Sequence, residues 1–544
     1  MALSACGPSD SSTIEPLAPR TFDMDASTQS SMPGAESRVV AAIDIGSNAV
    51  RMEIAEVLPD GRVEVIERLQ RAVRLGQDAF RRGRLGGRSM RAAVDVLRGF
   101  RELLGLYRVD QVRAVATSAV REATNADMFL DRVYLTTGLA VDVIDTSEES
   151  RLTVSAVRQG MRNTFTDRAR ETLIADVGGG STLLTILRGG EIVTSQSLRL
   201  GAVRLQELLG GDNLPPRRAA EMLRTYVNNA VIALHGSLAL DQIEVFVAVG
   251  GDARFAARQV GRPIDNSDLL EVEIEQFDRL VERCERLSAD ELAKRFGLPF
   301  AEAETIVPAL LVYQALLHRG KAERIVVSHV SMRDGLLLEL ARRVTGGEDE
   351  ALLAGVIHSA MTLAEKYRVD IDHGMNVAEL CVKLFDFLQR DHGLNPRHRL
   401  LLRVAGLLHE VGGFVSNRSH HKHSEYLIAN SEIFGLSRSE IAVVSQIARY
   451  HRRSLPRTSH PVYMALKRDD RVVVNKLAAM LRVADALARG HSRKMRHMTM
   501  ERDGDDLVLT VPGEYDLALE QHSLAAKSDL FDEVFGMRIR LETG

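Results

Sequence analysis

The sequence predicts an α/β protein made of two similar halves, followed by an all-α domain and a small C-terminal α/β unit. Two observations lead to this fold class. A short apolar run that ends in Asp and Gly and continues into a hairpin occurs at residues 39–46 and again at residues 173–178, as expected for strands that alternate with helices. From about residue 350 to 490 the strand pattern stops and the apolar positions take helical spacing.

The length and composition indicate several globular domains. The 544 residues allow three or four domains of roughly 100 to 200 residues each, and a content of 45% hydrophobic and 26% charged residues excludes a wholly disordered or fibrous chain. We predict a disordered extension rich in Ser, Thr, Pro, Asp and Ala over 1–37, two α/β halves over 38–165 and 166–345, a helical domain over 346–500 and the terminal unit over 501–544.

Charge and cysteine usage exclude several classes of protein. The 70 Lys and Arg residues nearly balance the 74 Asp and Glu residues, and a net charge of −4 excludes a globally basic nucleic-acid binder. Cys6, Cys284 and Cys381 form no CxxC pair, so neither a disulfide framework nor a cysteine zinc site is supported. No uninterrupted apolar stretch reaches the roughly 18 to 20 residues of a membrane span. Residues 3–6 mimic a lipidation site, but no apolar segment precedes them. We expect a cytoplasmic protein without nucleic-acid or membrane partners.

In the first half, residues 39–45 form a buried strand, and alternation through residue 57 continues it into a hairpin that turns at residues 59–61. Apolar residues at helical spacing predict a helix over 88–106, and a strand follows at 112–115. The half therefore begins as a strand hairpin and continues with a helix and a further strand.

The second half repeats this opening. A strand over 173–177 leads into a hairpin that turns at Gly189 and Gly190, with its last strand at 192–195. Two further apolar strands follow at 245–249 and 325–328. Beyond the helical domain, the pattern predicts strands at 507–511 and 537–541 on either side of a helical run over 517–535.

The repeated Gly-rich turns suggest phosphate chemistry. Asp44 and Asp176 each end a buried strand and face a Gly-rich turn, and such a turn lets several backbone N–H groups converge on phosphate oxygens. A carboxylate at this position can hold a divalent cation or orient an attacking water. One Asp-x-Gly turn is also ordinary turn chemistry, but two copies with the same following hairpin are a far more specific signal.

Motifs along the chain resemble those of one known family. The chain contains, in this order, IDIGSNAVRM, ATSAVREATNA, DTSEESRL, ADVGGGST, RLGAVRL, VAVGG and VSHVSMRDGLL. This series resembles the exopolyphosphatase / guanosine pentaphosphate phosphatase (Ppx/GppA) family from about residue 39 to 344, and the helical region resembles the family's longer members. The resemblance implies two actin-like (ribonuclease H-like) subdomains of the acetate and sugar kinase, chaperone and actin superfamily.

The resemblance also implies site residues. Glu149 matches the family's catalytic glutamate, which activates the attacking water, and Arg121 matches an arginine suited to clamp phosphate. The simpler alternatives are a surface helix arginine for Arg121 and, for the neighbouring Glu148, a solvated turn residue. Asp44 and Asp176 would hold Mg²⁺ or Mn²⁺. The expected phosphate-binding residues are Gly46, Ser47, Asn48, Gly178, Gly179, Gly180, Ser181 and Thr182.

Two positions depart from the family pattern. The family usually has Glu after the GGGST motif, where it is thought to help hold the metal, and Leu183 stands there in this chain. Leucine cannot ligate a metal, so the metal site would depend on Asp44, Glu149 and Asp176. Asp252 replaces the usual Thr after Gly250 and Gly251.

The helical domain carries a second set of polar residues. His373, the pair His409 and Glu410, and Asp485 follow the order of the HD phosphohydrolase pattern, with Glu in place of the Asp of the HD pair. A carboxylate one methylene longer would not superpose, so we predict an HD-like domain without a tightly bound metal.

A basic segment also lies in this domain. Arg449, Arg452 and Arg453, together with His423, could line a channel for a long polyanion. A solvated face is the simpler explanation, and the sequence favours neither of the two.

These features predict a phosphohydrolase that releases terminal phosphate from inorganic polyphosphate by metal-assisted attack of water. The alternatives are a guanosine pentaphosphate 5′-phosphatase, and a weakly active polyphosphate or alarmone-binding regulator, which Leu183 motivates. A kinase of the same superfamily fits less well, because SEESRL and ATSAVRE resemble the hydrolase branch. We expect a homodimer.

Overall fold

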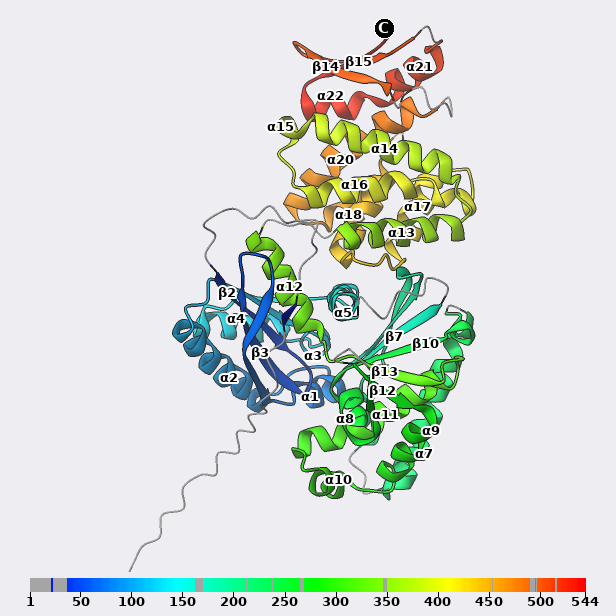
Figure 1. Ribbon diagram of the computed structural model, residues 1–544. Coiled ribbons are helices and arrows are strands. Elements are labelled where there is room, and N and C mark those ends of the chain that lie inside the picture. Colours follow the sequence, from blue (N-terminus) through cyan, green and yellow to red (C-terminus); the bar gives the residue numbers. More distant parts are fainter. Residues whose placement is uncertain are drawn as a thin grey trace, which may run out of the picture.

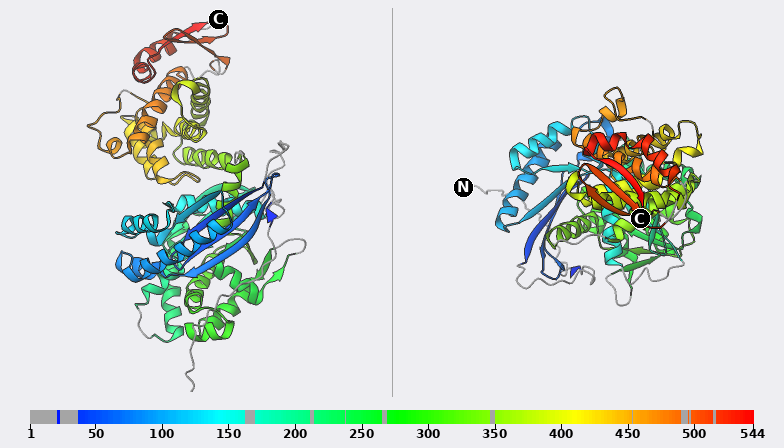
Figure 2. Two further views of the ribbon diagram at one scale, coloured as in Figure 1. Left: turned by 90° about the vertical axis from the view of Figure 1, so that its left-hand side faces the viewer. Right: turned by 90° about the horizontal axis from the view of Figure 1, so that it is seen from above.

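The computed structural model describes residues 21–22, 37–161, 170–210, 214–236, 238–264, 269–345, 350–452, 454–489, 495, 497–513 and 516–544. Two lobes with mixed sheets lie side by side, the helical domain sits on one end of both, and a small three-stranded unit lies farthest from the lobes (Figures 1 and 2). Of the extension predicted over residues 1–37, only Thr21–Phe22 and Ser37 belong to the described residues, and Thr21–Phe22 form a short strand.

The first lobe contains a six-stranded sheet in the order β1-β4-β3-β2-β5-β6. The central strand β2 (Arg38–Ile45) is buried on both faces. This burial explains why its sequence is a continuous apolar run rather than an alternation of apolar and polar residues. The strands are β1 (Thr21–Phe22), β2 (Arg38–Ile45), β3 (Ala49–Val57), β4 (Val63–Ala72), β5 (Gln111–Ala116) and β6 (Val141–Val143), and the helices are α1 (Leu75–Arg82), α2 (Gly87–Leu106), α3 (Ser118–Arg121) and α4 (Ala126–Thr137).

The second lobe repeats this topology. Its sheet has the order β11-β12-β13-β10-β7-β8-β9, so β9-β8-β7-β10-β13 matches β4-β3-β2-β5-β6: three antiparallel strands, then two parallel ones. The strands are β7 (Glu171–Val177), β8 (Thr182–Arg188), β9 (Glu191–Leu198), β10 (Val245–Val249), β11 (Arg262–Pro263), β12 (Leu270–Glu273) and β13 (Arg324–Val327), and the helices are α6 (Ala202–Leu208), α7 (Pro216–Ile232), α8 (Gly251–Val260), α9 (Ile274–Cys284), α10 (Ala289–Phe296) and α11 (Phe300–Leu317).

The most apolar helix is α11, the central helix of the second lobe. Among the described residues it is the one helix that is long and apolar enough to cross a membrane, but 78% of it is buried inside the protein. Its residues pack into the core of the second sheet, so its apolar composition is explained by burial on nearly all sides.

Two helices, α5 (Thr146–Gly160) and α12 (Met332–Thr345), lie between the two sheets (Figure 1). They cross closely, because a Cβ at Gly335 would lie 2.2 Å from the carbonyl oxygen of Leu152. The predicted division at residue 345 places α12 in the second half, whereas the helix packs on α5 and on β2 of the first lobe. Helix α12 follows β13 in the chain but buries its apolar face against the other sheet.

The helical domain and the terminal unit share one apolar core. The long helix α20 runs through its centre, and residues of β15 and α22 belong to the same cluster. The helices are α13 (Glu350–Lys366), α14 (Ile371–Phe387), α15 (Gln389–His392), α16 (Pro396–Leu408), α17 (His420–Ala429), α18 (Arg438–Arg449), α19 (Pro461–Met464) and α20 (Arg468–Leu487), followed by β14 (Thr499–Asp503), β15 (Asp506–Val511), α21 (Ala518–Lys527), α22 (Asp529–Phe535) and β16 (Arg538–Thr543).

Candidate active site

Each lobe ends its central strand in the same tight turn. The N–H of Gly46 donates to the carbonyl of Ala49 at 3.1 Å, and the N–H of Gly178 donates to the carbonyl of Ser181 at 2.9 Å. A Cβ on either glycine would lie 3.1 or 3.2 Å from the accepting carbonyl oxygen. The two Asp-Gly motifs therefore form equivalent loops at equivalent strand ends.

The two loops meet across the junction of the lobes. A Cβ on Gly179 would lie 2.9 Å from the Cβ of Ser47, and a Cβ on Gly180 would lie 2.2 Å from the Oγ of Ser118. Ser47 and Ser118 share a hydrogen bond of 3.0 Å between their hydroxyl groups. The Nδ2 of Asn48 donates to the carbonyl of Ala301 in the other lobe at 2.8 Å. Both loops thus lie against each other at one junction between the lobes.

The second loop is held from outside by the first turn of α6 and by Gly201, the residue directly before it. The N–H groups of Ala202 and Val203 donate to the carbonyls of Gly178 and Gly179, each at 2.9 Å, and the Nε of Arg204 donates to the carbonyl of Gly180 at 2.8 Å. A Cβ on Gly201 would lie 2.2 Å from the backbone of Gly180. The RLGAVRL motif gave no site residue in the sequence analysis, although a glycine directly before a helix is a signal for close backbone approach.

Glu149 and Arg121 form an ion pair beside the two Gly-rich loops. Glu149 is 8% exposed, and the Nη1 of Arg121 donates to its Oε1 and, at 2.6 Å, to the carbonyl of Ile144. Burial raises the pKa of Glu149 to about 7; Arg121 opposes this rise, and Asp44 and Asp176 add to it. A carboxyl with this pKa is partly deprotonated at neutral pH, as a general base requires.

Asp44 is held by two arginines. Its Oδ2 accepts a hydrogen bond from Nη1 of Arg333 at 3.4 Å and lies 3.6 Å from Nη1 of Arg51. Arg333 also donates to Glu53 at 2.9 Å. The Oδ1 of Asp44 is buried and takes no hydrogen bond from the described residues. Arg333 is a site residue that the sequence analysis missed.

Two further carboxyls are half-buried on the second lobe. Burial raises the pKa of Asp176 to about 6, against a hydrogen bond of 3.2 Å from the hydroxyl of Thr153. Burial also raises the pKa of Asp252 to about 7, with Glu302 adding to the rise and Arg254 and Arg51 opposing it. Asp252, which stands where the family usually has Thr, therefore adds a second carboxyl with a raised pKa to the second lobe.

The carboxylates fit a hard cation such as Mg²⁺. The unpartnered Oδ1 of Asp44 and the carboxyl of Asp176 supply the oxygen ligands that Mg²⁺ prefers, and this ion is usually bound by one or two carboxylates together with water and substrate phosphate. Leu183 adds no ligand, because its side chain is a hydrocarbon. It lines a small pocket with Ser147 and Ser195. The fit therefore depends on Asp44 and Asp176.

Comparison with known proteins agrees with this geometry. A profile of the Ppx/GppA phosphatase family matches residues 54–344, and a profile of Ppx/GppA phosphatase, domain III, matches residues 357–534. The chain belongs to the Ppx/GppA phosphatase family. Within this family, the domain III profile covers most of the helical domain and of the terminal unit.

Named relatives and solved structures add detail. A Vibrio vulnificus protein named guanosine-5'-triphosphate,3'-diphosphate pyrophosphatase is 26% identical over 90% of this chain and 94% of its own length, and a Vibrio cholerae protein of the same name is 27% identical over 88% and 93%. An exopolyphosphatase structure from Cytophaga hutchinsonii has a TM-score of 0.51 at 23% identity and covers 57% of this chain and 99% of its own. The predicted actin-like fold of the two lobes is confirmed.

The expectation that Glu148 is a solvated turn residue is wrong. Its carboxylate accepts two hydrogen bonds of 2.7 Å from Arg151 and one of 3.1 Å from Arg113, and both arginines also bond Glu339 of α12. Because Glu148 and Arg151 are three residues apart on α5, one helix face presents both to this network. The network ties α5 to β5 of the first lobe and to α12.

The basic segment of domain III lies beside α17. The side chain of Arg449 is 13% exposed, and its Nε forms an ion pair of 2.9 Å with Glu425 of that helix. This pairing engages the Nε of Arg449 in a helix contact, and its assignment to a polyanion channel stays a prediction. Arg452 lies near His420 and His421, whose pKa values are lowered by burial and further by this arginine. Arg453 lies outside the described residues, and the channel stays a prediction for Arg452 and His423.

Domain III brings the predicted HD-type residues together. One ligand atom each from His373, His409 and Glu410 lies within 4.8 Å of the others, and Oδ1 of Asp485 lies 4.0 Å from Nε2 of His409. The other oxygen of Asp485 accepts a hydrogen bond from the ammonium of Lys527. Because this ammonium neutralises Asp485 and repels a cation, the set does not fit a tightly bound metal. The absence of a tight metal stays a prediction.

Proposed function

We propose that this chain is a metal-assisted phosphohydrolase that releases the terminal 5′-phosphate of guanosine pentaphosphate. The observation that supports this substrate is the extent of the similarity. The Vibrio relatives, which are named for a guanosine-5'-triphosphate,3'-diphosphate, match 90% and 88% of this chain. The Cytophaga hutchinsonii exopolyphosphatase matches 57% of it. The Vibrio matches are long enough to extend into domain III.

In the proposed reaction the two Gly-rich loops hold the terminal phosphate. Backbone N–H groups of the loops around Ser47 and Gly179 would donate to its oxygens. The Nε and Nη2 of Arg121 donate no hydrogen bond within the described part of the chain, because Nη1 makes both hydrogen bonds of this side chain. These two nitrogens would complete the clamp. A guanidinium in this position stabilises charge that develops on the phosphoryl oxygens.

Glu149 would take the proton from the attacking water. Its hydrogen bond from Arg121 orients the carboxylate, and its pKa of about 7 lets it accept a proton at neutral pH. Asp44 and Asp176 would hold Mg²⁺ or Mn²⁺, which supplies positive charge to the phosphate oxygens when bound. Asp44 is kept in place by Arg333 and Arg51.

Two other functions remain as alternatives. Polyphosphate hydrolysis uses the same chemistry, but the pairing of Arg449 with Glu425 removes one charge from the channel that favoured the polymer. A weakly active binding protein is motivated by Leu183, which contributes no metal ligand. The cytoplasmic location, the homodimer and the HD-like assignment of domain III belong to the same proposal.

Phosphate release from parallel substrates tests the proposal. Purified protein is incubated with guanosine pentaphosphate, polyphosphate or ATP, each with and without Mg²⁺ or Mn²⁺. We expect metal-dependent release from guanosine pentaphosphate with the highest kcat/KM. A higher kcat/KM for polyphosphate would transfer the function to the first alternative, and tight binding of either ligand without release would support the regulator. Light scattering on the same sample tests the dimer.

A further inference from the structure

We propose that Asp145 is a positioning residue that ties the catalytic helix α5 to domain III. The inference rests on the proposed function, in which Glu149 on α5 is the general base. Asp145 is the N-cap of α5, and its Oδ1 accepts the N–H of Glu148 at 2.9 Å. Its Oδ2 accepts the N–H of Arg438, 293 residues further along the chain, at 2.6 Å. One carboxylate therefore binds the N-termini of two helices from different domains.

The bond to Arg438 is a link rather than a requirement of α18 itself. Helix α18 has its own capping box, in which the side chain of Ser437 accepts the N–H of Glu440 and the Glu440 side chain accepts the N–H of Ser437. The N–H of Arg438, at the first position of the helix, has no partner within α18. Asp145 supplies that partner with a negative charge, which both helix N-termini favour.

The backbone of Asp145 and of the residue before it is hydrogen-bonded to the pair Arg121 and Glu149. The residue before it, Ile144, accepts a hydrogen bond of 2.6 Å from Nη1 of Arg121, and the same Nη1 donates to Glu149. The N–H of Glu149 in turn donates to the carbonyl of Asp145 at 3.0 Å. A shift of Asp145 would therefore move both the backbone acceptor of Arg121 and the helix turn that carries Glu149.

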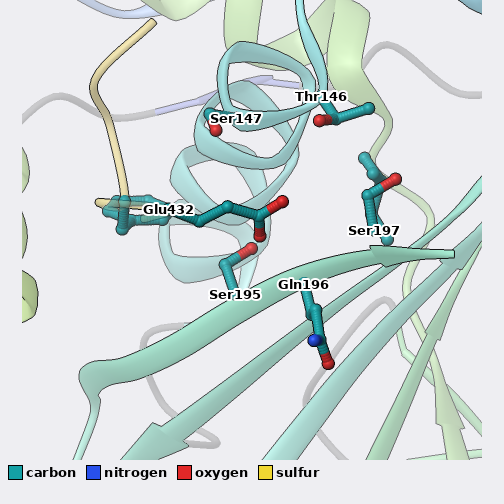
Figure 3. A pocket seen from close by; sticks show the side chains of 8 residues that line it. Thr146, Ser147, Ser195, Gln196, Ser197 and Glu432 are labelled. Atoms are coloured by element: carbon teal, nitrogen blue, oxygen red, sulfur yellow. The ribbon is translucent and has the colours of Figure 1, made fainter. Parts of the chain in front are cut away.

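The surroundings of Asp145 form a packed junction between the domains. Glu432 extends from domain III towards Ser195 of β9, beside Thr146 and Ser147 at the start of α5 (Figure 3). The neighbouring Phe434 is buried in the core of the lobes, and its N–H donates to Ser359 of α13 at 3.0 Å. Because Phe434 fixes the domains together, the bond from Asp145 sets the position of α5 within an interface that is already formed.

The experiment removes one N–H group. Arg438→Pro deletes the donor, and proline suits the first position of a helix. Ser437 has φ −69° and ψ 161°, an extended conformation that a following proline accepts. Arg438→Ala is the matched control, because it removes the same side chain and keeps the N–H. We expect Arg438→Pro to lower kcat roughly three- to ten-fold relative to Arg438→Ala, with KM changed less than about two-fold.

A double-mutant cycle provides the second test. Asp145→Asn keeps an oxygen that can cap α5 but presents an NH₂ group to Arg438 instead of an acceptor. We expect Asp145→Asn to lower kcat like Arg438→Pro, and the double variant to be no slower than either single one, because both remove the same bond. Equal kcat in Arg438→Pro and Arg438→Ala, or additive losses in the double variant, would overturn the proposal.

All variants are assayed on the substrate that the wild type hydrolyses best, alongside Glu149→Gln. Full activity in Glu149→Gln would refute the proposed function itself. An inactive Glu149→Gln together with an unchanged Arg438→Pro would refute the link alone. Thermal unfolding of each variant shows whether the fold is kept, and if Arg438→Pro does not fold, a kcat in Asp145→Asn equal to that of the wild type overturns the link.

Discussion

At the scale of single residues, Asp44 and Glu149 lie in different surroundings that suit different tasks. Asp44 is fixed by two arginines and keeps one oxygen without a hydrogen bond from the described residues, which suits a cation. Glu149 is buried with a single arginine partner, and its pKa is raised to about 7, which suits proton transfer. The two carboxyls therefore suit the two roles proposed for them, metal binding for Asp44 and proton transfer for Glu149.

Glu149→Gln tests the assignment of the base. The amide keeps the size of the side chain and can accept the hydrogen bond from Arg121, but it cannot take a proton from water. We expect phosphate release to fall by roughly two to four decades while substrate binding is retained. Arg121→Ala, by contrast, should weaken binding as well as turnover. Single-turnover release and calorimetric binding measure the two effects; loss of binding in Glu149→Gln would point to a binding role instead.

The pH dependence follows from the same residue. Glu149 acts as a base only when deprotonated, and its pKa is about 7. We expect kcat/KM to fall about ten-fold per pH unit below that value and to level off above it. The residual activity of Glu149→Gln, measured over the same range, shows what substrate ionisation contributes. An acid limb centred near the ordinary carboxyl pKa of about 4.3 would contradict the raised value.

Leu183→Glu tests the departure from the family pattern. Leu183 pairs with Asp176 across β7 and β8 and lines the pocket at the start of α5. If metal binding limits the natural protein, a carboxylate here should raise the rate or lower the Mg²⁺ concentration needed for half-maximal activity. Leu183→Gln is the control of equal size without charge. Titration of activity with Mg²⁺ measures the change, and an unchanged titration would show that Asp44 and Asp176 suffice.

The sequence identified candidate residues where the chemistry is local. Asp44, Asp176 and Glu149 lie in short motifs, and the structure brings them close enough to interact electrostatically. Arg333 was missed because it lies 289 residues from Asp44, and no local pattern joins the start of α12 to the end of β2. Glu148 was misjudged although Arg151, three residues on, has the spacing of a helical ion pair.

At the scale of elements, the second Gly-rich loop depends on the segment that packs behind it. A Cβ on Gly201 would lie 2.2 Å from the backbone of Gly180, so Gly201→Ala must displace the loop. We expect a loss of roughly 1–3 kcal/mol in the free energy of unfolding. Because the displaced loop is the proposed phosphate-binding loop, we also expect phosphate release to fall even where the protein is fully folded. Gly99→Ala on α2 is the control, because its Cβ would meet nothing within 4 Å. Denaturant unfolding and phosphate release measure both; a fully active Gly201→Ala would contradict the role of this segment.

The strands were predictable where burial is uniform, and the helix packing was not. Residues 39–45 read as a buried strand because β2 is covered on both faces. Helix α12 follows β13 directly, so the chain order assigned it to the second half, whereas the helix packs on α5 and β2. The sequence signal for this packing is Gly335, where α12 crosses α5 closely. A glycine alone does not indicate which helix packs against it.

At the scale of the whole molecule, the terminal unit completes domain III rather than standing apart. Arg482 of α20 donates to the carbonyl of Lys527 at 2.9 Å and pairs with Asp529, while the Lys527 ammonium bonds Asp485. The unit therefore places one positive charge inside a cluster of histidines and acids. A lysine in this position does electrostatically what a bound cation would do, since it neutralises the buried carboxylate.

Lys527→Met tests whether that charge excludes a metal. Methionine keeps an unbranched apolar side chain and removes the ammonium, which frees Asp485 beside His373, His409 and Glu410. We expect affinity for Zn²⁺ or Mn²⁺ to rise by at least an order of magnitude, because the like-charge repulsion is gone. Calorimetric titration and elemental analysis of protein purified without added metal measure it. Lys476→Met, which removes a lysine bonded to His392 instead, should not change the affinity. Stoichiometric metal in the wild type would refute the prediction of an empty cluster, and unchanged affinity in Lys527→Met would show that Lys527 is not what keeps a cation out.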